Sequence, residues 1–214
     1  MSGLRTLYCA EPDQATLLDE LLAWRQDASP VGALALLPET EKERLSQLQA
    51  ICRASGLDLV GALFPAIVEG GQFHRQGMLL LPFAEMPGTA LLSNLPNDAN
   101  TAAAQIANAV EPMLDGSSYT LFLIFDAMVP NIASILDALY LLLADRVAYA
   151  GVNAGSESFQ PIPCLFDENR VVTDGVLCLL LPGRQGAAID HGYLAPKEII
   201  TAITKRLRSS LRKT

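Results

Sequence analysis

The stretch that decides the fold is Tyr149–Leu181, which reads YAGVNAGSESFQPIPCLFDENRVVTDGVLCLLL. It starts as an apolar strand and runs into a glycine-containing loop at Gly151–Ser156. Three short β-forming runs follow, separated by turn residues at Asp167–Asn169 and by Asp174-Gly175, and Asp-Gly is a strong hairpin signal. The pattern predicts an antiparallel meander in the C-terminal part of the domain.

Upstream of this stretch, strand and helix patterns alternate. Apolar residues at helical spacing predict helices over Asp13–Arg25, Glu39–Ala54, Asn100–Leu114 and Pro130–Ala144. Apolar runs predict buried strands over Arg5–Cys9, Val31–Leu37, Leu57–Val68, Gln76–Pro82, Tyr119–Phe125 and Val147–Ala150. We expect Asn100 to cap the third helix and a loop to start at Gly61-Ala62. Alternation of this kind favours crossover connections and a partly parallel sheet.

The predicted fold class is therefore α/β to α+β, with a mixed β-sheet flanked by helices and a C-terminal antiparallel meander. Residues 1–195 are predicted to form the domain. Residues 196–214 are predicted to form a basic helix or tail, because Lys205, Arg206, Arg208, Arg212 and Lys213 crowd there without an acidic residue among them. A solvated helix end explains this cluster, and a binding tail for an anionic partner is the alternative.

Composition narrows the class of protein. Half of the 214 residues are hydrophobic, but the longest apolar runs fall well short of the roughly 20 residues that a membrane helix needs. We expect no secretory signal at Met1–Tyr8, and the four cysteines form no CxxC pair, so reduced cysteines in a cytoplasmic protein are predicted. A net charge of −8 argues against a nucleic-acid partner.

Polar residues and glycines follow two successive apolar strands. Asp126 ends one strand, and the other leads into a loop that contains Gly151, Asn153, Gly155 and Ser156. Ligands usually bind at strand ends on one edge of an α/β sheet, where glycines let the backbone approach and offer free N–H groups. If the strands are parallel, we expect these residues to lie side by side as a ligand site. A tight turn that needs positive φ is the alternative.

The sequence offers no motif for catalysis or for a cofactor. The glycine loop lacks the GK[ST] ending of a P-loop, no GxGxxG opens a helix, and no serine lies in a GxSxG elbow. The chain has two histidines and four scattered cysteines, and their spacing matches none of the usual Cys/His patterns of metal sites. We expect no metal, no cofactor and no catalytic residue. His191 could orient a ligand or act as an acid or base, or be structural.

Several of these features together resemble the N-terminal domain of the FIST family, intracellular signal-transduction modules of bacteria and eukaryotes. Phe125-Asp126-Ala127 is similar to the family's Asp-Gly after a strand, and Ala150–Ser156 is similar to its Gly-Gly-x-Ala-Gly-Asp loop. His191-Gly192-Tyr193 resembles its closing His-Gly-Trp. The segment Leu59–Val68 resembles a family segment with Gly-Cys-Ser-Thr-x-Gly-Glu, but here Ala62–Ile67 replace its polar groups. A more apolar pocket is expected at this loop.

The resemblance implies a non-enzymatic sensory domain that binds a small ligand of the amino acid or small carboxylate class. The site residues that it implies are Asp126, Gly151, Asn153, Ala154, Gly155 and Ser156, with Gly61 and His191 nearby. A protein-interaction or scaffold domain without a ligand and a hydrolase that uses Cys or Ser with His191 are the alternatives. A signalling protein, a second FIST domain or a second copy of the chain are the expected protein partners; nucleic acid and membrane are not.

Overall fold

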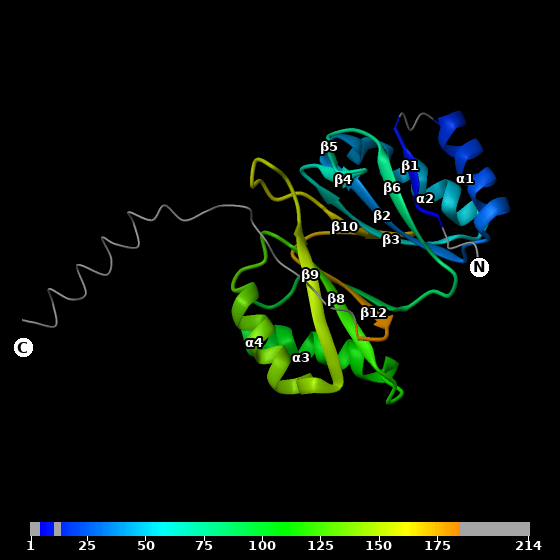
Figure 1. The fold of residues 1–214 in the computed structure, drawn as a ribbon. Coiled ribbons are helices and arrows are strands. Elements are labelled where there is room, and N and C mark those ends of the chain that lie inside the picture. The colour runs from blue at the N-terminus through cyan, green and yellow to red at the C-terminus, as the bar shows by residue number, and fades with distance from the viewer. Residues whose placement is uncertain (1–4, 11–13, 185–214) are drawn as a thin grey trace, which may run out of the picture.

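The computed structural model describes residues 5–10 and 14–184. Two β-sheets lie face to face, and a pair of helices covers the outer face of each (Figure 1). The order of the layers is therefore helix, sheet, sheet, helix. The mixed sheets and flanking helices confirm the predicted α/β to α+β class.

The first sheet has the strand order β1-β6-β2-β3-β10-β11. Its strands are β1 (Leu7–Cys9), β2 (Gly32–Pro38), β3 (Asp58–Phe64), β6 (Met78–Phe83), β10 (Leu165–Asp167) and β11 (Val171–Val172). β2 and β3 are parallel and every other pair is antiparallel. The crossover between the parallel pair consists of the 3₁₀ helix η1 (Glu39–Arg44) and α2 (Leu45–Ser55), as the alternation predicts. Gly56 ends α2 with φ +64°, a conformation that glycine adopts without strain.

The second sheet has the strand order β7-β12-β8-β9. Its strands are β7 (Gly88–Leu92), β8 (Tyr119–Asp126), β9 (Val147–Ala154) and β12 (Val176–Pro182). β8 and β9 are parallel, with α4 (Ile132–Leu143) and η3 (Ala144–Arg146) between them. Among the described residues, β9 pairs with β8 alone, so its outer edge carries no partner strand.

The remaining elements complete the two halves. α1 (Gln14–Ala28) lies beside α2 on the first sheet, and β4 (Ile67–Glu69) and β5 (Gln72–His74) form a separate hairpin (Figure 1). α3 (Ala99–Val110) and η2 (Glu111–Met113) pack with α4 on the second sheet. The cap of α3 is Asp98 and not Asn100, because the Asp98 carboxylate accepts the Thr101 N–H at 2.8 Å.

Alternation along the strands divides the core in two. Leu121, Leu123 and Phe125 of β8 pack under α3 and α4, whereas Ile124 packs between the sheets. β12 divides in the same way, with Leu177 in the layer between the sheets. Successive side chains point to opposite faces of a strand, so a strand covered on both faces needs apolar residues throughout. This explains the uninterrupted apolar runs.

The predicted meander is divided between the two sheets. β10 and β11 do form the expected antiparallel hairpin. β12 does not continue it, because after Asp174-Gly175 the chain crosses to the second sheet and pairs with β7 and β8. Asp174 has φ +47° and turns the chain between sheets instead of closing a two-stranded hairpin. An Asp-Gly pair predicts a sharp reversal of the chain. It does not predict which strand β12 pairs with, because that depends on which core β12 can complete.

Two predicted loops are also wrong. Gly61 lies in the middle of β3, and Gly151, Asn153 and Ala154 lie within β9. The glycines are strand residues at points of close approach: a Cβ on Gly61 would overlap the Phe166 ring and the Ala35 carbonyl, and one on Gly151 would overlap the Leu123 carbonyl. A glycine in a strand marks such crowding as readily as it marks a turn.

Candidate functional site

Three of the residues predicted to form a site do come together. In the parallel pair β8–β9, Asp126 lies opposite Ala154, and the Ala127 N–H donates to the Ala154 carbonyl at 2.8 Å. Gly155 follows directly and donates its N–H to the Leu63 carbonyl of β3 at 2.9 Å. The strand ends therefore meet as expected, at a point where the two sheets are joined.

The Asp126 carboxylate holds this junction together. It is buried, one oxygen accepts the Met128 N–H at 2.9 Å, and the other accepts the Asp174 N–H at 2.8 Å. The Cys164 thiol also donates to it, and burial together with the Asp126 charge raises the pKa of that thiol to about 12. These bonds connect the end of β8 to the start of β12. The buried Asp126 carboxylate therefore has a structural role.

The loop after β9 uses its own polar groups. The Ser156 hydroxyl accepts the Ser158 N–H at 3.1 Å, and the Glu157 N–H donates to the Glu39 carboxylate at 3.2 Å. Glu157 also forms an ion pair with Arg75. The N–H groups expected to hold a ligand carboxylate thus donate within the chain. Ligand binding at Gly155 and Ser156 remains a prediction that this arrangement does not favour.

The other predicted residues lie apart from this junction. Gly61 is covered by the Phe166 ring, on the face of β3 opposite to Val60 and the space between the sheets. Gly151 and Asn153 line a groove of about 370 Å³ between β9 and α4, which we call the β9 groove. Its lining is mainly apolar and includes Leu123, Phe125, Ile132, Leu136, Tyr149 and Val152. His191 lies outside the described residues.

The cysteines offer no reactive thiol. Cys9, Cys52, Cys164 and Cys178 are all buried, and none of them forms a disulfide. Burial raises the pKa of the thiols of Cys52, Cys164 and Cys178 to about 12, so the thiolate that a nucleophile needs is scarce at neutral pH. These positions therefore act as small core residues.

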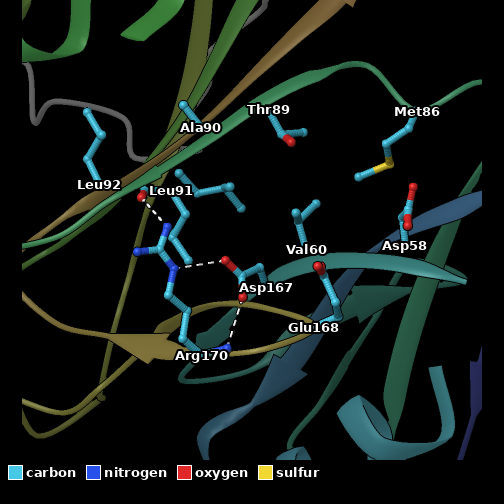
Figure 2. A pocket seen from close by; sticks show the side chains of 11 residues that line it. Asp58, Val60, Met86, Thr89, Ala90, Leu91, Leu92, Asp167, Glu168 and Arg170 are labelled. Atoms are coloured by element: carbon cyan, nitrogen blue, oxygen red, sulfur yellow. Dashed lines mark hydrogen bonds and ion pairs between the residues drawn. The ribbon is translucent and has the colours of Figure 1, made fainter. Parts of the chain in front are cut away.

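A charged cavity of about 500 Å³ opens between the two sheets. Strands β3, β7 and β12 and the β10–β11 turn all contribute to it (Figure 2). Val60, Leu91 and Leu177 are apolar parts of its lining, and Thr89 and Met86 lie along one side. Its charged groups are Asp58, Asp167, Glu168 and Arg170. We call it the inter-sheet cavity.

Arg170 is held in place at the cavity wall. Its Nε donates to the Asp167 carboxylate at 3.0 Å, and its Nη2 donates to the Leu91 carbonyl at 2.8 Å, as Figure 2 shows. The turn itself is anchored from behind, since Gln49 Nε2 donates to the Asp167 carbonyl at 2.7 Å and Arg53 donates to the Glu168 carbonyl. A guanidinium has five N–H donors, so the two bonds leave donors for a ligand.

Two carboxylates face the same space without a cation of their own. Among the described residues, the Asp58 side chain accepts no hydrogen bond, and Glu168 accepts one from the neighbouring Asn169 amide at 2.8 Å. Within residues 5–10 and 14–184, no group of three or more His, Cys, Asp or Glu is arranged to hold a metal ion. The cavity thus presents fixed negative charge beside an oriented guanidinium.

Sequence reasoning missed this cavity because its charged residues look ordinary. Asp167 and Glu168 sit in a turn, where acidic residues need no further role. Asp58 and Arg170 are 112 positions apart in the chain and come together only through the β3–β10 pairing. The one available signal was that Asp167, Glu168 and Arg170 crowd a four-residue turn between two apolar strands.

Comparison with protein-family models identifies the domain. The model of the FIST N domain matches residues 34–206, most of the chain and all the strands from β3 to β12.

The chain belongs to the FIST family.

This confirms the resemblance seen in the sequence, and FIST N domains are sensory domains of signal-transduction proteins. None of the curated proteins matches the chain. Within the described part of this FIST N domain, no helix has the length and apolarity that a membrane span requires.

Proposed function

We propose that this FIST N domain is a non-enzymatic sensor that binds an amino acid in the inter-sheet cavity. The observation that carries the proposal is the meeting of Asp58, Glu168 and the Asp167–Arg170 pair around one space. Its volume of about 500 Å³ falls within the usual range for small-ligand sites, roughly 300–1,000 Å³.

The charges favour an ammonium-bearing ligand. Three carboxylates and one guanidinium give the cavity an excess of negative charge, so a simple carboxylate would meet repulsion. An amino acid could place its carboxylate on the free N–H groups of Arg170 and its ammonium on Asp58 or Glu168. Val60 and Leu177 would then receive the apolar part of its side chain. Among amino acids, those with a second cationic group match the excess charge best.

Binding calorimetry on the full chain tests the proposal, with L-arginine, L-lysine, L-leucine and succinate as the probes. We expect L-arginine or L-lysine to bind most tightly and succinate not to bind. Asp58→Asn should weaken binding about 10-fold, which corresponds to about 1.4 kcal/mol. Asp137→Asn is the matched control, because Asp137 is an exposed acid on α4 with the same change in charge.

Two results would contradict this assignment. If none of the four probes binds or raises the melting temperature, the cavity is not an amino acid site. If a probe binds with equal affinity to wild type, Asp58→Asn and Glu168→Gln, the ligand lies elsewhere. A variant that fails to bind must also keep the wild-type melting temperature, since Glu168 belongs to the turn that Arg53 anchors.

A protein-interaction role is the second candidate. The apolar segment Ala62–Ile67, which replaces the polar residues of the family, favours this role. Leu63 of this segment is buried in the core, and Phe64 packs against the core. This segment fills its surroundings and leaves no polar groups for a ligand there. A FIST N domain of this kind would act through exposed apolar surface, and co-purification of a stoichiometric protein partner without any small-ligand binding would favour this role.

A further inference from the structure

Among the described residues, no helix covers Gly151–Asn153 of β9, and these three residues are exposed. α3 and α4 lie against the outer face of the second sheet (Figure 1). The β9 groove lies beside α4. Gly151 has no side chain to fill the groove over Leu123. The wall on the α4 side has Leu136 at 37% exposed and Tyr140 at 56% exposed, and the Tyr140 ring contacts Tyr149. An apolar groove flanked by exposed apolar side chains is a candidate contact site.

The chain leaves the described structure at the foot of this groove. Pro182, the last residue of β12, lies opposite Tyr119, where β8 begins. The Gly183 N–H donates to the Ser118 carbonyl at 2.7 Å, and the Arg184 guanidinium donates to the Asp145 carbonyl. Asp145 lies in η3, directly between the end of α4 and the start of β9. Residues 185–214 therefore start beside the surface that lacks a cover.

The sequence of those residues suits the groove. Ile199, Ile203, Leu207 and Leu211 recur every four positions and form one stripe if the segment is helical, with Ser209 on the opposite face. A helix over 199–211 would be about 20 Å long, close to the roughly 18 Å of the twelve-residue α4. The family match extends to residue 206, so the family domain continues past the last described residue.

Charge also favours this segment. Residues 185–214 contain six basic and two acidic residues in a chain whose net charge is −8, so the rest of the chain is strongly acidic. Two exposed acids on this side of the domain are Asp137, which follows Leu136 on α4, and Asp145 in η3, whose carbonyl accepts from Arg184. Basic side chains flanking the apolar stripe would lie beside these carboxylates, although exposed pairs of this kind contribute little on their own.

We propose that residues 199–211 bind in the β9 groove as a third helix of the outer layer, beside α4 and over β9. The apolar stripe covers Leu136, Tyr149 and the backbone at Gly151, which lie on the α4 side of the groove, and the polar face with Ser209 points to solvent. The segment thus completes the core of the second half of the domain within one chain.

Disulfide trapping in the full chain tests this placement, because the four native cysteines are buried. The variant pair Leu136→Cys and Leu207→Cys should oxidise to an intramolecular crosslink that migrates as a monomer. The control pair Leu141→Cys and Leu207→Cys should not crosslink, since Leu141 is 82% exposed and lies on the outward side of the same helix. A crosslinked dimer would overturn the proposal and assign the groove to a second copy, and equal crosslinking at both positions would overturn it as well.

Hydrogen exchange provides a second measurement that needs no new cysteine. Backbone amides of residues 199–211 should exchange at least 10-fold more slowly than in an unstructured peptide. Leu136→Lys should remove this protection, and Leu141→Lys should leave it intact. Within the segment, Ile203→Asp should act like Leu136→Lys, and Ser209→Asp should not. Unprotected amides in the wild-type chain, or protection that survives Leu136→Lys, would show that the segment does not occupy the groove.

Discussion

Removal of the Asp126 carboxylate should destabilise the domain whether or not a ligand is present. The side chain is 2% exposed, and its oxygens accept the N–H groups of Met128 at 2.9 Å and Asp174 at 2.8 Å. Asp126→Ala leaves both donors without their acceptor, and each loss costs about 1–3 kcal/mol. We therefore expect the free energy of unfolding to fall by about 3 kcal/mol. Asp126→Asn, which keeps one acceptor oxygen, should lose about 1–2 kcal/mol.

Urea denaturation at pH 7 measures these differences, with Asp137→Asn as the control. A chain of this size loses roughly 2–4 °C of melting temperature per kcal/mol, so Asp126→Ala should melt about 6–12 °C lower than wild type. The control should stay within about 0.5 kcal/mol of wild type, because Asp137 is exposed. A loss below 1 kcal/mol for Asp126→Ala, or an increase in stability, would refute the structural role and return Asp126 to the list of ligand-binding candidates.

Three further outcomes follow from the described contacts. Phe166→Ala should cost about 3–5 kcal/mol in the free energy of unfolding, because the fully buried ring fills the space over Gly61 on the face of the first sheet that α2 covers, and a loss under 2 kcal/mol in urea would contradict this packing. The thiols of Cys52, Cys164 and Cys178 have pKa values raised to about 12, so the unfolded chain binds fewer protons than the folded one above about pH 9. Stability should be level from pH 6 to 8 and fall by about 1 kcal/mol per thiol by pH 10; unchanged unfolding midpoints at pH 8 and pH 10 would argue against this. Asp98→Ala should cost about 1 kcal/mol through the loss of the α3 cap, whereas Asn100→Ala should change the unfolding midpoint very little.

Local pattern was sufficient for the elements that a single segment determines. Apolar runs at Val31–Leu37 and Tyr119–Phe125 became buried strands, and the helical spacing in Pro130–Ala144 became α4. The parallel pairs β2–β3 and β8–β9 followed from strand-helix-strand order, since a crossover helix brings the next strand back in the same direction. The ordered motifs around Asp126 and Gly155 were enough for the family.

The candidate site was predicted less well, because the role of each polar side chain depends on its burial and its hydrogen-bond partners. The position of Asp126 beside Ala154 was correct, but the burial of its carboxylate and its bonds to the Met128 and Asp174 N–H groups could not be read from spacing. The inter-sheet cavity was missed entirely, since Asp58 and Arg170 are distant in the chain.

The sequence by itself determined the strand and helix segments, the crossover connections and the family, because these depend on periodicity and turn residues within short stretches. Only the tertiary structure decided that β10 and β12 belong to different sheets, that Gly61 and Gly151 are strand residues, and that a charged cavity lies between the sheets. The physical reason is that a strand pairs with whichever neighbours complete a buried core. In Tyr149–Leu181 that requirement overrode the hairpin signal of Asp174-Gly175.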